Sequence, residues 1–463
     1  MSKDEYLITD PPLKALTVFA MPMILGSFFQ QVYNMADSII VGQFVGSSAL
    51  AAVGACAALT NVFICVALGA GVGAGVLVSR YFGAREYGKM KTIVSTSLIS
   101  FLLLSIILGV FGFCFSHAMM SGLQTPADIL DEAVLYLRVY FVGFPFLFMY
   151  NILSTMFTSI GESKIPLGLL IFSSILNIVM DLWMVAGLGL GVFGAALASA
   201  IGTTVGALMI VFYLMRRRCA LRFHPIKMSR KSMQLMRRNI GYMCRLGSSA
   251  FLCEVAIACM MFVGNQVFIH YLKEDGVAAF SIACYFFPII FMVYNAIAQS
   301  AQPIISYNYG LNESQRVCRA YLLALKTAIG CGVCFALVTI FCSPEIVGMF
   351  IDRSYPAYDI AVKGLPLYAT GFVFFAVNIV SIGYFQSVER AKYATVITLL
   401  RGFILLTACF FGLPLLLGDR GIWLATPLAE MLTTLFILVI YISGKKEHKE
   451  KSVSLDKMGC TPT

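Results

Sequence analysis

Four acidic residues of this sequence stand inside long apolar runs, namely Asp37, Asp181, Glu254 and Glu430. An ionised side chain costs about 2.5–3.5 kcal/mol at the centre of a spanning helix, so such residues are functional candidates. Asn177 precedes Asp181 by four residues, and a helix therefore places the two on one face. Carboxylate and amide oxygens can bind a hard cation, and two carboxylates in a low dielectric can share a proton. The pattern predicts a cation or proton site that contains Asp37 and Asp181.

Each acid also has a structural interpretation. Asp37 and Asp181 could be buried, hydrogen-bonded residues that fix helix packing, but their pairing favours the cation site. Glu254 lies about nine residues beyond Arg245, too deep to reach the membrane interface freely, and both a substrate contact and a packing role stay open. Glu430 is predicted to face a cavity or the outer interface.

The elements that position these residues are membrane spans. Of the 463 residues, 59% are hydrophobic and only 12% are charged, whereas a soluble domain carries about 25% charged residues. A helix that crosses a membrane needs about 20 mostly apolar residues. Twelve such segments are predicted, at about 15–41, 49–79, 92–115, 133–158, 167–188, 193–215, 243–270, 277–306, 321–341, 361–386, 394–416 and 422–442. The glycine-rich run of residues 69–75 is predicted to pack helices closely.

Basic residues predict the orientation of these spans. All but six of the 33 Lys and Arg residues fall on one side of the membrane or in the terminal segments. The six are Arg138, Lys273, Arg353, Lys363, Arg401 and Arg420. The positive-inside rule then places both termini in the cytoplasm. The net charge of +10 is concentrated on that side, which indicates attraction to anionic lipid and no nucleic-acid partner.

An internal repeat divides the spans into two halves. A shift of 227 residues places Asn151 on Asn378, Glu162 on Glu389 and Gly194 on Gly421. Six spans per half give both halves the same orientation, and a pseudo-two-fold axis runs along the membrane normal. We therefore predict an all-α polytopic membrane protein of two six-helix bundles. The predicted parts are an N-lobe (1–215), a basic cytoplasmic linker (216–245), a C-lobe (246–443) and a cytoplasmic tail (444–463).

This organisation predicts a secondary transporter with a substrate cavity between the lobes. A membrane enzyme would need clustered His residues, or a Ser or Cys beside a base, and the spans contain no such cluster.

Three segments resemble a known family. PMILGSFFQQVYNMADSIIVGQFVGSSALAAVGA (22–55) is similar to the first-helix signature of multidrug and toxic compound extrusion (MATE) transporters. GAGVLVSRYFGARE (73–86) and LNIVMDLWMVAGLGLGVFGAALASA (176–200) resemble further segments of that family. The likeness covers about residues 11–443 in the family's order and is closest to the prokaryotic DinF-like branch.

The resemblance implies antiport of amphipathic, often cationic, organic compounds against H⁺ or Na⁺, without a cofactor. It implies a bacterial inner or plasma membrane, and a monomer is expected. The alternative is a flippase for lipid-linked precursors within the same superfamily, which would need a cationic cavity.

The resemblance also assigns roles to single residues. Asp37, Asn177 and Asp181 match the family's cation site, and Ser199 stands where relatives often carry Thr. Na⁺ would bind at Asp37, Asn177 and Asp181. The substrate cavity is assigned Tyr33, Tyr136, Asn151 and Glu254. Independently of the resemblance, Pro22 can bend span 1 where neighbouring groups satisfy the freed carbonyl, and both a gating hinge and a static kink stay open. Span 10 reads GFVFFAVNIVSIGYF without an acid, so coupling through the N-lobe is favoured over a second cation site in the C-lobe.

Overall fold

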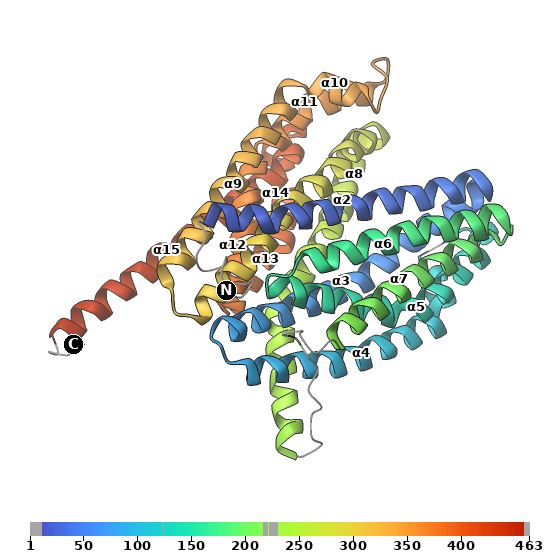
Figure 1. Ribbon diagram of the computed structural model, residues 1–463. Coiled ribbons are helices and arrows are strands. Elements are labelled where there is room, and N and C mark those ends of the chain that lie inside the picture. Colours follow the sequence, from blue (N-terminus) through green and yellow to red (C-terminus); the bar gives the residue numbers. More distant parts are fainter. Residues whose placement is uncertain (1–11, 124, 216–220, 222–229, 458–463) are drawn as a thin grey trace. The chain divides into compact units, whose positions relative to one another are not determined.

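The computed structural model describes residues 12–123, 125–215, 221 and 230–457, and the regular elements of these ranges are helices (Figure 1). Lipid cannot hydrogen-bond the backbone, so apolar segments satisfy their N–H and C=O groups internally as helices. The elements are α2 (Pro12–Phe44), α3 (Ser47–Gly83), α4 (Tyr87–Gly122), α5 (Ala127–Ser159), α6 (Lys164–Asp181), η1 (Leu182–Gly187), α7 (Gly191–Met215), α8 (Arg230–Gly310), α9 (Ser314–Phe341), α10 (Ser343–Gly348), α11 (Pro356–Ala369), α12 (Phe372–Ser387), α13 (Ala391–Leu399), η2 (Leu400–Ile404), α14 (Leu405–Leu417) and α15 (Asp419–Lys457).

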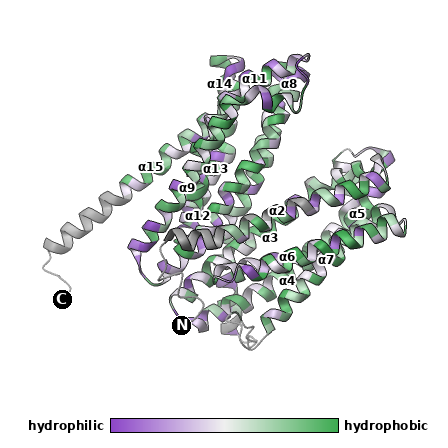
Figure 2. Ribbon diagram, turned by 45° about the horizontal axis from the view of Figure 1, so that its top comes forward, coloured by the Kyte–Doolittle hydropathy of each residue, from purple (hydrophilic) through white to green (hydrophobic). Residues whose placement is uncertain are grey.

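Twelve spans can be assigned within the described residues. Nine helices in the described part of the chain are long and apolar enough to span a membrane, and α11 and α12, which are bent by 46° relative to each other, add a tenth candidate span when they count as one. Helix α8 contains two spans, because its helical geometry breaks at Lys273 (φ 55°, ψ −149°), and the 33-residue α2 is a further span. Hydrophobic residues run along the helices, and hydrophilic ones gather near their ends (Figure 2). The predicted all-α, twelve-helix fold is confirmed.

Two spans that correspond in the repeat each contain a π-helical turn. Span 5 consists of α6 and η1, and span 11 consists of α13, η2 and α14. A π-turn widens the helix locally and is often found at functional positions. Asp181 ends α6 directly before η1, and Arg401 lies within η2.

Alternating glycines bring α3 close to two helices. A Cβ atom on Gly73 would overlap the carbonyl oxygen of Met243 in α8, and one on Gly75 would lie 2.5 Å from Ser159 Oγ in α5. Gly71 faces α5 in the same way. The predicted role of the glycine run in close helix packing is confirmed.

Contacts divide the chain into two compact units. Unit 1 comprises Met1–Val255, Gln299–Leu323 and Gln386–Ala391, and unit 2 comprises Ala256–Ala298, Ala324–Phe385 and Lys392–Thr463. These units differ from the two sequence halves, because three segments of the predicted C-lobe, residues 246–255, 299–323 and 386–391, belong to unit 1. Polar contacts explain the difference: Ser79 donates to the carbonyl of Pro303 at 3.0 Å, Ser306 donates to the carbonyl of Ser387 at 3.2 Å, and Arg80 forms an ion pair with Glu389.

Candidate cation site in unit 1

Asp37 and Asp181 meet in the interior of unit 1. Asp37 lies on α2, and Asp181 lies at the end of α6, which packs against α2. Asp37 is 8% exposed, Asp181 is fully buried, and their side chains are hydrogen-bond partners. A hydrogen bond between two carboxyl groups requires a proton on one of them. The acid pair therefore needs one proton, or another cation, between its carboxyl groups.

Asn177 links the acid pair to α7. The amide orientation that satisfies both of its ends places Nδ2 2.9 Å from Asp181 Oδ2, where it donates a hydrogen bond. Its Oδ1 accepts from the backbone N–H of Ser199 at 3.1 Å and from Ser199 Oγ at 3.3 Å. Asn177 and Asp181 share a helical face, as the i, i+4 spacing predicts. Both Asn177 and Ser199 thus join the predicted site.

Each acid also presents a buried oxygen that no N–H or O–H donor of the described residues reaches. These oxygens are Asp37 Oδ1 and Asp181 Oδ1. Neither carboxylate forms an ion pair with a Lys or Arg among the described residues. Because an unsatisfied buried acceptor costs about 1–3 kcal/mol or more, these oxygens favour the arrival of a proton or a cation. Their chemistry fits the hard ions H⁺ and Na⁺.

Tyrosines extend the cluster. The Tyr33 hydroxyl, one helical turn before Asp37, is a hydrogen-bond partner of Ser199, and Tyr136 of α5 lies near both Asp37 and Tyr33. Tyr140, four residues after Tyr136, lies near Tyr33, and its hydroxyl is buried without a partner. Sequence analysis missed Tyr140, although its i, i+4 spacing from Tyr136 on a helix was a usable signal.

A compact apolar cluster covers one end of the site. It includes Ile40 and Val41 one turn after Asp37, and Val185 one turn after Asp181. The other buried members are Ala49, Val192 and Ala195, and Tyr136 packs against them. Such a layer excludes water and lowers the local dielectric, which strengthens interactions between the acids and a bound cation. The sequence did not predict this layer.

Three residues predicted for the site or its motion lie apart from the acids. Asn151 is 15 residues beyond Tyr136 on α5, roughly 22 Å along the helix, and its Nδ2 donates to the carbonyl of Leu147 at 2.9 Å. Glu254 of α8 is half-buried and lies near Cys65 of α3. Helix α2 runs continuously through Pro22.

Glu430 requires a correction. The sequence predicted that it faces a cavity or the outer interface, but its side chain is 3% exposed and forms an ion pair with Arg401. The prediction failed because hydropathy does not show which faces of spans 11 and 12 meet.

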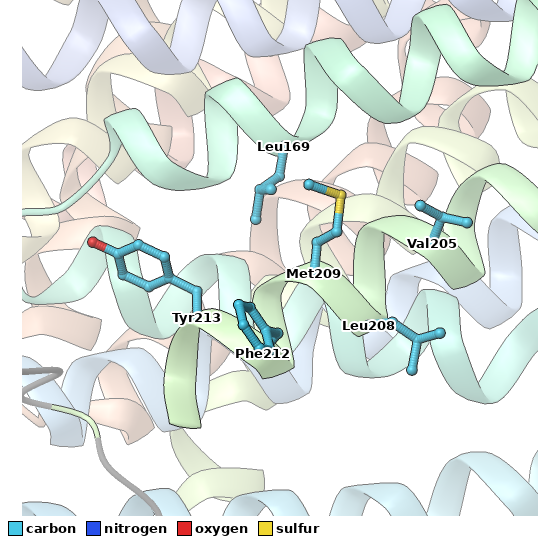
Figure 3. A pocket seen from close by; sticks show the side chains of 6 residues that line it. All are labelled: Leu169, Val205, Leu208, Met209, Phe212 and Tyr213. Carbon is cyan, nitrogen blue, oxygen red and sulfur yellow. The ribbon is translucent and has the colours of Figure 1, made fainter. Parts of the chain in front are cut away.

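A separate groove lies on the surface of α6 and α7. It has a volume of about 410 Å³ and is lined by apolar side chains and one tyrosine (Figure 3). The lining residues are Leu169, Val205, Leu208, Met209, Phe212 and Tyr213. Phe212 is 65% exposed, as expected for a side chain that faces lipid, and none of the predicted site residues lines the groove.

The comparison with protein families decides the identity of the chain. The MatE family model matches residues 22–183 and 250–410. The chain belongs to the MatE family. The two matched segments begin 228 residues apart and so reproduce the internal repeat. The predicted resemblance to MATE transporters is confirmed, and this MatE chain is a multi-pass membrane transporter and not an enzyme.

Relatives of the MatE chain include named exporters. "Multidrug export protein MepA" of Staphylococcus aureus is 25% identical over 455 residues, which cover 95% of this chain and 96% of the relative. "Probable multidrug resistance protein YoeA" of Bacillus subtilis is 25% identical over 351 residues, which cover 74% and 75% of the two chains.

Solved structures show the same fold. A crystal structure of "MATE in the bent conformation" matches with a TM-score of 0.88 at 23% identity and covers 98% of this chain and 100% of its own. The "outward-facing conformation of a multidrug resistance MATE family transporter of the MOP superfamily" matches with a TM-score of 0.82 at 24% identity, over 94% and 96% of the two chains.

Proposed function

We propose that this MatE chain is a secondary multidrug exporter that exchanges amphipathic organic cations for H⁺ or Na⁺ bound at Asp37 and Asp181. One observation carries the proposal: two buried carboxyl groups share a hydrogen bond, and no basic side chain neutralises them among the described residues. The names of MepA and YoeA support the substrate class.

The coupling follows from electrostatics. Two neighbouring carboxylates in a low dielectric cannot both stay ionised without a counter-charge. When one coupling cation binds, the net charge of the pair changes from −2 to −1, and its helices α2 and α6 can approach. When the cation leaves, the two carboxylates repel each other or recruit another cation. Binding therefore biases a conformational equilibrium by its differential affinity for two states.

Asn177 lies beside Asp181 in either orientation of its amide. With Nδ2 toward Asp181 it donates to the carboxylate at 2.9 Å, which a proton shared by the carboxyl groups leaves intact. With Nδ2 toward Ser199 Oγ, at 3.3 Å, its oxygen faces Asp181 and can serve as a ligand for Na⁺. The chemistry of the site therefore suits both H⁺ and Na⁺.

The wider setting is part of the proposal. The protein consists of an N-lobe (1–215) and a C-lobe (246–443), both termini are cytoplasmic, and it works as a monomer in a bacterial inner or plasma membrane. Tyr33, Tyr136, Asn151 and Glu254 line the substrate path, and Pro22 supplies the hinge. A flippase for pyrophosphate-linked lipids would need a cationic cavity, whereas this site is acidic.

Transport in proteoliposomes tests the coupling. Purified protein is reconstituted, and uphill movement of ethidium is followed under an imposed pH gradient or an imposed Na⁺ gradient. We expect transport under at least one of the two gradients, and the gradient that drives it identifies the coupling ion. Ethidium movement at the same rate with and without each gradient would contradict the proposal.

A further inference from the structure

A second polar cluster lies inside unit 2, and it contains its own cation. Arg401 of η2 and Glu430 of α15 form an ion pair in which each side chain is 3% exposed. Arg401 Nη2 donates to Glu430 Oε1 at 2.6 Å, and Arg401 Nε donates to the two carboxylate oxygens at 3.1 and 3.2 Å. This forked geometry is the strong form of the arginine–carboxylate interaction.

Neighbouring groups complete the cluster. Asn378 of α12 donates through Nδ2 to Glu430 Oε2 at 2.6 Å, and Thr434 Oγ1 donates to Asn378 Oδ1 at 2.9 Å. The Arg401 guanidinium also lies over the Phe375 ring, 4.6 Å from its centroid. The carboxylate thus has donors on both oxygens, and the guanidinium has an aromatic face that favours a cation.

The repeat relates this cluster to the Asn177–Ser199 contact of unit 1, whereas Asp37 and Asp181 themselves fall on Gly264 and Ala408. In each half, a polar contact joins the fifth and sixth spans beside a π-helical turn: Asn177 with Ser199, and Arg401 with Glu430. The shift of 227 places Arg401 on Ser174, one turn before Asn177, and Glu430 on Thr203, one turn after Ser199. Spans 5 and 6 run antiparallel to each other. One turn before Asn177 and one turn after Ser199 therefore lie at the same depth in the helix pair, about 5 Å from the Asn177–Ser199 contact.

The two clusters differ in charge balance. The unit 1 cluster has two carboxyl groups and no basic partner among its described residues, so it needs a cation from outside. The unit 2 cluster has one carboxylate and one guanidinium and is neutral as built. Removing one partner of a buried pair leaves an uncompensated charge and is strongly destabilising, whereas replacing both is often neutral.

We propose that Arg401 is a tethered cation that supplies the counter-charge of the unit 2 cluster in place of an exchangeable ion, so that the exchangeable cation binds in unit 1 alone. The transport consequence of this inference rests on the proposed function. Whether Arg401 compensates the charge of Glu430 can be tested without a transport measurement. Tyr294 of α8 and Tyr368 of α11 are the titratable side chains that face Glu430 from the elements packed on it.

The first test measures thermal unfolding of the purified protein in detergent. Arg401→Ala should lower the midpoint temperature by several degrees, because Glu430 loses its counter-charge. The midpoint should recover on addition of millimolar guanidinium chloride, which can replace the missing side chain, but less on addition of NaCl. Arg138→Ala is the matched control, since Arg138 donates only to the Ser116 hydroxyl at 3.3 Å in the described structure, and guanidinium should not rescue it.

The double variant Arg401→Gln/Glu430→Gln separates charge compensation from coupling. Two neutral partners restore charge balance, so its midpoint should return toward that of the unsubstituted protein, and gradient-driven ethidium export should be retained. Export lost as completely as in Asp37→Asn would overturn the proposal, because Glu430 would then carry a coupling ion. A double variant that does not fold, or an Arg401→Ala protein whose midpoint is unchanged by guanidinium, would also overturn it. Loss of coupling in Asp37→Asn tests the proposed function separately.

Discussion

At the scale of single residues, the acid pair was predictable in part. The type of Asp37 and Asp181, and the i, i+4 spacing of Asn177, predicted a shared site, and the structure brings all three together with Ser199. The partner of Glu430 was not predictable, because helical periodicity in an apolar span does not identify the facing helix. Tyr140 was overlooked despite its spacing from Tyr136, because a buried tyrosine in an apolar run is most often a packing residue.

Glu254 provides a prediction at this scale. Glu254→Gln should weaken export or narrow the substrate range without abolishing coupling, because the side chain lies near Cys65 and apart from the acid pair. Uptake of several organic cations into proteoliposomes, compared under the same gradient, would measure the effect. Complete loss of gradient-driven export would show that coupling is not confined to Asp37 and Asp181. A change in thermal stability alone would assign Glu254 to packing.

At the scale of elements, the sequence predicted where the helices lie in the chain better than which helices pack against each other. Hydropathy located the spans because lipid demands long apolar helices, and the break at Lys273 falls between the predicted spans 7 and 8. The π-turns η1 and η2 were not predictable, since they depend on how a helix packs and not on its composition. The glycine run of α3 was interpreted correctly because a close backbone approach requires a missing side chain.

Glycine substitutions in α3 test this packing. Gly73→Ala adds a Cβ that overlaps the carbonyl oxygen of Met243, so it should destabilise the protein by about 1–3 kcal/mol and reduce export. Gly54→Ala is the matched control, because its Cβ meets no atom within 4 Å and alanine is the better helix former. Midpoint temperatures of the two purified variants provide the measurement. Equal stability would contradict the close contact of α3 with α8.

At the scale of the whole molecule, the repeat was the most informative feature of the sequence. The shift of 227 predicted two related halves, and the family match falls once in each. The predicted lobe boundaries stay a prediction. The compact units do not follow the sequence halves, because contacts such as the Arg80–Glu389 ion pair attach short segments of the second half to unit 1. Contacts of this kind depend on the conformation and cannot be derived from hydropathy or charge bias.

Topology is the prediction that belongs to this scale. A reporter fused at Arg230, in the basic segment that joins the halves, should be found in the cytoplasm, and one fused at Tyr355 should be found outside. The reason is the concentration of Lys and Arg on one side of the membrane. Fusions at other loops serve as controls for insertion. The reverse pattern would refute the charge argument.

The central claim is that Asp37 and Asp181 bind the exchangeable cation, and uphill export by their neutral variants tests it most directly. Asp37→Asn and Asp181→Asn are each reconstituted with the unsubstituted protein and with Asp128→Asn, an exposed acid at the start of α5, as the control. We predict that each site variant inserts and folds but loses gradient-driven ethidium export, while Asp128→Asn retains it. Uphill export by both site variants at the rate of the control would contradict the account and make the acid pair a structural contact.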